Sequence, residues 1–192
     1  MKENAIISPD HRIRVHDRTF RPYIHREEIE DMVREIAARI NSDFAGEEIT
    51  ILVILKGAMV FASDLIRHIK VPVTIEFTKA SSYGRSMKSS GALSIEGLFT
   101  EVADRNVMVI EDIVDTGTTI RELIKHLSGL QPKSVTITAL LSKPTMHVET
   151  PTAIDYVGRE IAPDFVVGYG MDYAGQGRQL DAIWVATDDT SA

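Results

Sequence analysis

The sequence predicts an α/β fold in which a mostly parallel, twisted sheet is flanked by helices. Two short and nearly continuous apolar runs, Ile49–Leu55 and Val107–Ile110, have the composition of strands that are buried on both faces. Segments with helical periodicity alternate with such runs along the chain. That alternation is typical of strand–helix–strand units with right-handed crossovers, which build parallel sheets.

The first half of the chain supplies four predicted elements. In residues 25–41, apolar side chains recur at helical spacing with charged residues between them, which predicts an amphipathic helix. The strand Ile49–Leu55 follows, and residues 58–69 predict a second helix that stops near Pro72. Apolar and polar residues alternate with period two in Val71–Lys79, which predicts a strand.

The second half begins with residues 80–91, which contain five serines and two glycines and show no apolar periodicity. They predict a long mobile loop, and such loops tend to be lids or binding loops, although a plain solvent-exposed connection is the alternative. The remaining predicted elements are a strand at 107–110, a helix at 119–130, a strand at 134–141 and short strands at 165–169 and 183–186. The last forty residues break the alternation, so we expect them to form a small appendage over the end of the sheet.

Length and composition limit the class of protein. The 192 residues fit a single domain, and no repeat or polar linker divides them. The net charge of −7 provides no basic field that would hold nucleic acid or an acidic membrane. The chain has no cysteine, no signal-peptide pattern at its charged N-terminus and no long apolar segment, so we expect a soluble, cytoplasmic protein.

The segment Val109–Thr119 carries the strongest functional signal. Glu111 and Asp112 follow a buried strand, and Asp115-Thr-Gly-Thr-Thr119 then leads into a helix. A glycine allows close backbone approach, and the helix N-terminus with threonine hydroxyls supplies donors for a phosphate. Two carboxylates would repel a phosphate, but they suit ribose hydroxyls and a divalent cation. The segment therefore predicts a site for a phosphorylated ribose, whereas Asp-Thr-Gly alone would be an ordinary turn and helix cap.

The sequence VIEDIVDTGTT resembles the phosphoribosyl-diphosphate motif of type I phosphoribosyltransferases, in the form found in hypoxanthine-guanine phosphoribosyltransferases. The resemblance extends from about residue 20 to 185 and implies the type I phosphoribosyltransferase fold, with a core at about 25–165 and a hood from about 1–20 and 165–192. Leu55-Lys56-Gly57 is similar to the diphosphate loop of that family, in which a cis peptide precedes the lysine. Ser81-Ser82-Tyr83-Gly84 is similar to its closing loop.

The resemblance also implies roles for single residues in the transfer of phosphoribose to a purine. Asp115 would be the general base at purine N7, although a helix-capping aspartate is the alternative. Lys143 would donate to the 6-oxo group and Phe165 would stack on the base; without the resemblance, a buried core aromatic is the usual interpretation of such a phenylalanine. The implied substrate-binding residues are Leu55, Lys56, Gly57, Ser82, Tyr83, Glu111, Asp112, Ile113, Thr116, Gly117, Thr118, Thr119, Lys143, Phe165, Val166, Asp172 and Arg178. The implied ligands of Mg²⁺, the implied cofactor, are Glu111, Asp112 and Asp172.

The sequence departs from the family pattern at two places, and it leaves alternative functions open. Thr118 stands where many relatives carry a larger residue, and Ala174-Gly-Gln-Gly177 stands where bulkier residues are usual, which predicts a loosened hood. A transferase for xanthine or a pyrimidine, or a non-catalytic nucleotide-binding regulator, would share the phosphate loop. The resemblance implies a homodimer or homotetramer, and the side chain of Lys56 serves either the site or a subunit contact.

Overall fold

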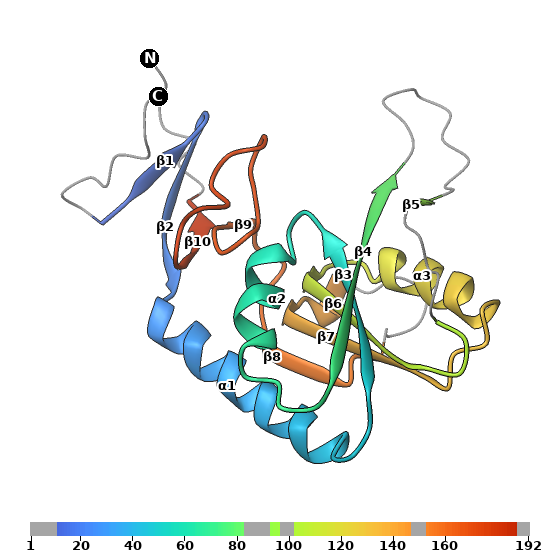
Figure 1. The fold of residues 1–192 in the computed structure, drawn as a ribbon. Coiled ribbons are helices and arrows are strands. Elements are labelled where there is room, and N and C mark those ends of the chain that lie inside the picture. The colour runs from blue at the N-terminus through green and yellow to red at the C-terminus, as the bar shows by residue number, and fades with distance from the viewer. Residues whose placement is uncertain (1–10, 83–92, 97–101, 147–152, 188–192) are drawn as a thin grey trace.

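The computed structural model describes residues 11–82, 93–96, 102–146 and 153–187. Within these ranges no helix is long and apolar enough to cross a membrane. The described elements form a large sheet with helices on both faces and a second, smaller sheet at one end (Figure 1).

The large sheet confirms the predicted α/β class. Its strands are β3 (Ile49–Leu55), β4 (Val73–Ser82), β5 (Leu93–Glu96), β6 (Asn106–Val114), β7 (Ser134–Ser142) and β8 (Tyr156–Glu160). They lie in the order β5-β4-β3-β6-β7-β8, and every neighbouring pair is parallel except β4 and β5. Because the five parallel strands run in one direction, their carboxyl ends share one edge of the sheet, where ligands of open α/β sheets collect.

Helices cover the two faces of this sheet. On one face, α1 (Arg26–Asp43) and α2 (Met59–Ile66) bury their apolar sides against alternate residues of β3, such as Ile51 and Val53. On the other face, α3 (Thr118–Ser128) packs with Leu52 and Ile54 of the same strand. Successive side chains of a strand point to opposite faces, so β3 is apolar throughout because both of its faces are covered. A short 3-10 helix, η1 (Pro144–Met146), follows β7.

The small sheet joins the two ends of the described chain. Its strands are β1 (Ile13–Val15), β2 (Arg18–Ile24), β9 (Val166–Val167) and β10 (Ile183–Ala186), in the antiparallel order β1-β2-β10-β9. Phe20 and Val167 lie in its core. The predicted appendage therefore includes the N-terminal strands, and β2 runs on to Ile24, directly before α1.

Two predicted strand ends differ from the structure, and the strands β1, β2, β5 and β8 were not predicted. Strand β6 runs through Glu111 and Asp112 to Val114, so the prediction that the strand ends at Ile110 is wrong. Strand β4 likewise extends to Ser82 and takes up the first residues of the predicted loop 80–91; the rest of that loop, up to Gly91, lies outside the described residues. Continued pairing explains both, since β6 bonds to β7 as far as Val114 and β4 bonds to β5.

Strand β8 was not predicted from the sequence. Residues that are distant along the chain stabilise it. Its Tyr156 hydroxyl donates to Asp43 over 2.7 Å, and Arg159 pairs with Glu28 over 2.9 Å, so α1 anchors it on one side. The Asp155 carboxylate accepts the backbone N–H of Ile137 over 2.7 Å. None of these partners lies near 156–160 in the sequence.

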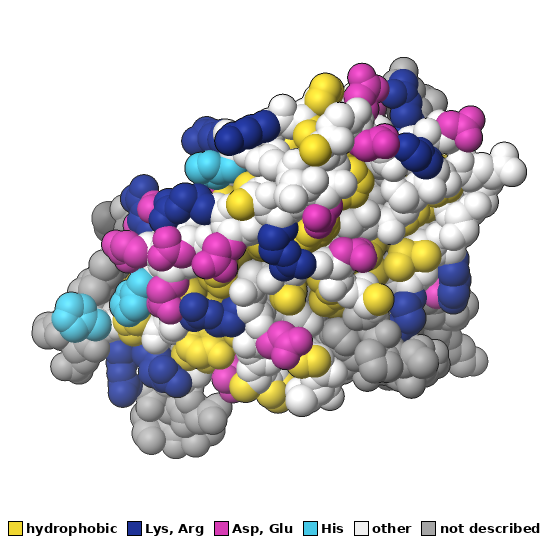
Figure 2. Space-filling model, turned by 90° about the horizontal axis from the view of Figure 1, so that it is seen from below, with side chains coloured by type: hydrophobic (Ala, Val, Ile, Leu, Met, Phe, Trp, Pro, Cys, Tyr) yellow, Lys and Arg dark blue, Asp and Glu magenta, His cyan; other side chains and the backbone are white. Residues whose placement is uncertain are grey.

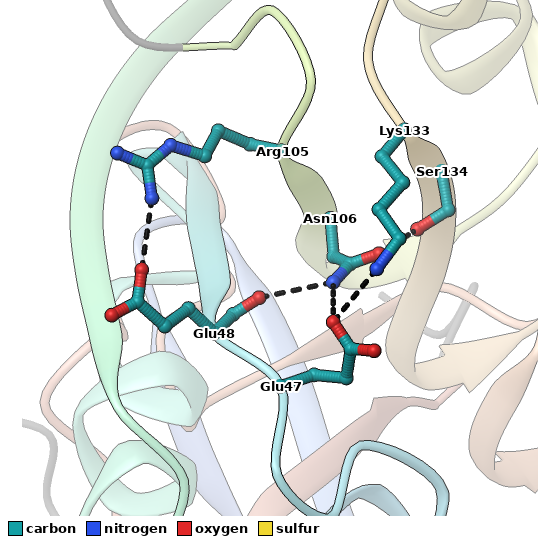
Figure 3. Close-up of polar contacts among 6 residues, drawn as sticks. All are labelled: Glu47, Glu48, Arg105, Asn106, Lys133 and Ser134. Atoms are coloured by element: carbon teal, nitrogen blue, oxygen red, sulfur yellow. Dashed lines mark hydrogen bonds and ion pairs between the residues drawn. The ribbon is translucent and has the colours of Figure 1, made fainter.

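A polar network fixes the opposite edge of the sheet, where β3, β6 and β7 begin (Figure 3). The Asn106 amide donates to Glu47 Oε2 and to the carbonyl oxygen of Glu48, each over 3.2 Å, and accepts from Ser134 Oγ over 2.9 Å. Lys133 and Arg105 form ion pairs of 2.8 Å with Glu47 and Glu48, respectively. Asn106 is buried, so its three bonds align the strand starts far from the edge where the predicted site lies.

Candidate active site

The phosphate loop lies between the end of β6 and the start of α3. Gly117 occupies the N-cap position with φ +74°, a left-handed conformation that favours glycine. Thr116 Oγ1 accepts the backbone N–H of Thr118 over 3.4 Å and bonds to the Thr118 hydroxyl over 3.1 Å. The residues Glu111, Ile113, Val114, Asp115, Thr116, Gly117, Thr118, Thr119 and Ile120 line a hollow of about 80 Å³. The predicted phosphate-loop residues thus come together at the N-terminus of an eleven-residue helix.

Arg121 is a member of this loop that the sequence prediction missed. Its guanidinium reaches back from the first turn of α3 and donates to the Thr116 carbonyl and to Thr118 Oγ1, each over 3.1 Å. It places a cation beside a loop that is predicted to hold an anion. The signal available in the sequence was a basic residue one turn into the helix, where side chains three residues apart are neighbours.

Glu111 and Asp112 are enclosed acids on neighbouring positions of β6. Glu111 lines the hollow of the phosphate loop, and its Oε2 is buried without a hydrogen-bond partner among the described residues. Burial, and then the charge of Asp112, raise the pKa of Glu111 well above its usual value. Burial also raises the pKa of Asp112 to about 6, while Arg178 opposes this shift. Two acids kept at this cost are expected to meet a cation or a hydroxyl donor when substrate binds.

Lys143 and Asp115 face each other across the ends of β7 and β6. Lys143 Nζ lies 3.2 Å from Asp115 Oδ2, and the lysine is only 7% exposed, whereas the Asp115 side chain is 49% exposed. The residue predicted to donate to the purine and the residue predicted to accept its proton are therefore partners. The Asp115 carboxylate is open to a ligand, whereas the buried Lys143 ammonium group would need an acceptor on that ligand to replace Asp115.

The loop after β3 meets β6 and the segment around Gly170. The Leu55–Lys56 peptide is cis, as the resemblance implies. A Cβ atom on Gly57 would lie 1.9 Å from Asp112 Oδ2, and a Cβ atom on Gly170 would lie 2.1 Å from the Gly57 carbonyl oxygen. Both glycines are required by close approach. Lys56 is exposed, so its side chain is free of the core.

Phe165, Asp172 and Arg178 belong to the segment that carries β9. Phe165 is 41% exposed, so it is not a buried core aromatic; it lies edge-on to Tyr173, with ring centroids 5.5 Å apart. Val166 is buried. Asp172 forms an ion pair with Arg178 and accepts the backbone N–H of Gly175 over 2.7 Å. Arg178 also donates to the Gly170 carbonyl over 2.6 Å, which ties the end of this segment back to its middle.

The glycines of the hood, from which a loosened hood is predicted, lie in a tight turn and in a close packing contact. Tyr173 and Gln176 exchange two backbone hydrogen bonds of 2.9 Å, and the intervening Ala174 and Gly175 have φ values of +50° and +83°. Two central residues with positive φ are the requirement of a tight type I′ hairpin turn. A Cβ atom on Gly177 would lie 2.4 Å from Val167 Cγ2, so glycine there allows close packing against the small sheet.

Some predicted site residues are not gathered by the structure. Within the described ranges no group of three histidine or acidic side chains lies close enough to hold a metal ion. Ser82 is the last residue of β4, and Tyr83 lies outside the described residues. A larger cavity of about 500 Å³ lies between α1, α2 and residues 169–181, and it shares only Arg178 with the predicted site. Chemistry, and not size, therefore identifies the site.

Comparisons with known proteins agree with this geometry. Residues 24–174 match the phosphoribosyl transferase domain family. The chain is 38% identical to the hypoxanthine-guanine phosphoribosyltransferase of Mycobacterium tuberculosis over 82% of this chain and 81% of that protein. It is 39% identical to the Bacillus subtilis enzyme of the same name over 84% of this chain and 90% of that protein.

Solved structures show the same likeness in the fold. A hypoxanthine-guanine phosphoribosyltransferase of Bacillus anthracis superposes with a TM-score of 0.79 at 38% identity, covering 86% of this chain and 96% of that chain. A Staphylococcus aureus hypoxanthine phosphoribosyltransferase gives a TM-score of 0.81 at 34% identity, covering 86% and 90%. The chain belongs to the phosphoribosyltransferase family, with the type I fold, and within that family to the hypoxanthine-guanine phosphoribosyltransferases.

Proposed function

We propose that the chain is a purine salvage enzyme that converts hypoxanthine, guanine or both, with 5-phosphoribosyl 1-diphosphate, into IMP or GMP and diphosphate. The observation that carries this proposal is the contact between Lys143 and Asp115 beside the phosphate loop. A 6-oxopurine presents a hydrogen-bond acceptor at O6. In the tautomer that carries a proton on N7, it also presents a donor at N7. A lysine next to a carboxylate matches that donor and acceptor pair, whereas the 6-amino group of adenine would face a second donor.

In the proposed reaction, purine N9 forms a bond to ribose C1 while the bond from C1 to diphosphate breaks. Asp115 accepts the proton that leaves N7, and Lys143 moves from Asp115 to the purine oxygen. Positive charge develops on the sugar in this step, and the carboxylates of Glu111 and Asp112 would stabilise it. Phe165 stacks on the base, and the backbone of Val166 bonds to its edge.

The phosphate loop holds the 5′-phosphate in this proposal. Backbone N–H groups at the start of α3 and the hydroxyls of Thr116, Thr118 and Thr119 are the donors. Arg121 supports the loop, because its guanidinium ties the Thr116 carbonyl to the Thr118 hydroxyl. The backbone of the Lys56–Gly57 loop and the side chain of Arg178 bind the diphosphate.

Glu111, Asp112 and Asp172 would hold Mg²⁺ together with oxygen atoms of the substrate. The unpartnered Glu111 Oε2 and the buried carboxyl of Asp112 fit a hard cation that prefers oxygen ligands. Bound Mg²⁺ would neutralise charge on the departing diphosphate. No three acids cluster among the described residues, so substrate oxygens and water would complete its coordination.

The small sheet would act as the hood over the base, within a single phosphoribosyltransferase domain. Its strand β9 follows Phe165 directly, and β2 and β10 hold β9 in place. Ser82 and Tyr83 would belong to a segment that closes over the site and excludes water, which would otherwise hydrolyse the sugar diphosphate. The position of Ser82 at the carboxyl end of β4 supports this, since that end lies on the edge of the sheet that carries the site.

One assay tests the reaction. The protein is incubated with phosphoribosyl diphosphate, Mg²⁺ and each purine base in turn, and nucleotide formation is followed. Turnover with hypoxanthine or guanine supports the proposal, whereas turnover with xanthine alone favours the xanthine enzyme. No turnover with any purine refutes the proposal and leaves a nucleotide-binding regulator. A regulator that also binds RNA or DNA would need a basic surface. Figure 2 shows acidic and basic side chains interspersed on the face it displays, so that face offers none.

The role of Asp115 is tested by Asp115→Asn. The amide keeps the shape of the loop but cannot take a proton, so we expect turnover to fall by about 10²–10⁴-fold. Binding of phosphoribosyl diphosphate, measured by calorimetry, is expected to stay within about twofold of wild type. Equal loss of turnover and binding would make Asp115 a structural residue.

We also propose that two copies of the chain associate through β4, in a homodimer or homotetramer. The side chains of Val73, Ile75 and Phe77 lie on the α2 face of the sheet, because they pair with Ile49, Ile51 and Val53 of β3, and they are 36%, 37% and 52% exposed. Light scattering after gel filtration measures the mass. Phe77→Glu is expected to release monomers, whereas Glu76→Gln, on the opposite face, is not; a monomeric wild type would refute the association.

A further inference from the structure

Three consecutive side chains at the turn between β1 and β2 contact Tyr173, an aromatic residue of the hood. The Tyr173 hydroxyl donates to Asp17 Oδ1 over 2.6 Å. The ring of His16 meets the Tyr173 ring edge-on at 5.8 Å, and the Arg18 guanidinium lies 5.2 Å from its centroid. Residues His16–Arg18, here called the hairpin turn, therefore hold Tyr173 through a hydrogen bond, a ring contact and a cation–π contact.

Tyr173 connects the two halves of the proposed site. On one side it meets the ring of Phe165 edge-on at 5.5 Å, and Arg18 lies over that ring too, 5.5 Å from its centroid. On the other side Tyr173 follows Asp172, which pairs with Arg178. A shift of Tyr173 would thus move both the ring proposed to stack on the base and the acid proposed to act at the diphosphate.

The buried ring of Phe20 supports both rings from below, with its centroid 6.2 Å from that of Tyr173 and 6.3 Å from that of Phe165. Beyond Tyr173 the chain turns back through Ala174 and Gly175, which are exposed, and a Cβ atom on Gly175 would meet no atom within 4 Å. Asp17 is well suited to its part, since the hydrogen bond from Tyr173, and next the one from His16, lower its pKa to about 2. A charged acceptor makes a stronger bond than a neutral one.

We infer that Arg18 is a positioning residue for the purine: it holds the rings of Phe165 and Tyr173 in the arrangement that receives the base. The inference rests on the proposed function. Arg18 itself lies over these rings and is not placed on the reacting atoms, so its loss should weaken base binding and leave the chemical step intact. A cation–π contact at an exposed site is worth enough to change affinity severalfold, and Arg18 makes two.

The experiment compares Arg18→Met, which keeps the length of the side chain and removes the charge, with Arg21→Met. Arg21 is an exposed arginine on the same strand, and three residues along a strand place it on the opposite face. For Arg18→Met we expect the KM for hypoxanthine or guanine to rise about three- to tenfold, with kcat and the KM for phosphoribosyl diphosphate within about twofold of wild type. Arg18→Lys should recover part of the loss, and Arg21→Met should match wild type.

Trp184, the one tryptophan of the chain, reports on the small sheet, since it packs in the same cluster as Tyr173. Unchanged Trp184 emission in Arg18→Met, together with a raised purine KM, supports the inference. An unchanged purine KM, an equal rise in both KM values, an equal effect of Arg21→Met, or altered Trp184 emission would each overturn it. A wild type without turnover refutes the proposed function and this inference with it, whereas an active wild type with an unaffected variant refutes the inference alone.

Discussion

Asp112→Asn is expected to make the unliganded chain more stable and at the same time to lower its turnover strongly. The carboxyl of Asp112 lies against Gly57 at the end of β6, in a place where burial disfavours its charged form. Asparagine has almost the same shape and carries no charge. The substitution should therefore raise the free energy of unfolding, because no charge is buried, and it should remove the interaction with ribose or Mg²⁺.

The size of the effect follows from the pKa of Asp112, which burial raises from 3.8 to about 6. Each pKa unit between the folded and the unfolded chain corresponds to about 1.4 kcal/mol, so the charged side chain costs about 3 kcal/mol. Because the pKa is higher in the folded chain, the wild type is not penalised below pH 3.8 and loses stability as the pH rises to about 6. The advantage of Asp112→Asn should grow over that window and stay constant above it.

Urea unfolding in metal-free buffer, at one protein concentration and several pH values, measures this difference. The turnover of Asp112→Asn should fall by about 10²-fold or more, as for loss of a charge that acts in the transition state. Equal stabilities at neutral pH, or a gap that does not change with pH, would show that Asp112 is not held at a cost. Retained turnover would remove it from the proposed mechanism.

Three other substitutions test the packing around the site. Gly170→Ala should lower the free energy of unfolding by at least about 2 kcal/mol and disturb the loop at Lys56, since its Cβ would lie 2.1 Å from the Gly57 carbonyl oxygen. Gly175→Ala, where φ is positive but the space is open, should lower it by only about 1 kcal/mol. Equal unfolding midpoints of the two variants would contradict this. Tyr169→Phe removes a 2.6 Å hydrogen bond to Asp64 and should cost about 1–3 kcal/mol at neutral pH. Burial raises the pKa of Tyr169 above 10.0, so the wild type alone should lose this group's stabilisation above pH 10.0, and a gap that fails to narrow there would refute the assignment. Asn106→Ala should cost about 1–3 kcal/mol without changing KM, and Arg105→Ala, which breaks an exposed ion pair, should cost less in the same urea titration.

The phosphate loop and the strand pattern could be predicted because their physics is local. A glycine between threonines after a buried strand sets the backbone of the loop by itself, and the structure places Gly117 at a left-handed N-cap. A short continuous apolar run is likewise a local sign of a strand that is covered on both faces, and it marks β3 and the first part of β6. The short strand β8 could not be found this way, since its stability comes from Asp43 and Glu28 on α1.

The sequence by itself predicted the fold class, the main helices and parallel strands along the chain, and the residues of the loop that is proposed to bind a phosphorylated ribose. Only the tertiary structure decided that Lys143 pairs with Asp115, that Glu111 keeps a buried oxygen without a partner, and that Arg18 lies over Phe165 and Tyr173. The physical reason is distance along the chain. Residues 28 or 155 positions apart meet only once the sheets have formed, and the burial that shifts the pKa of Asp112 exists only in the packed edge between β3 and β6.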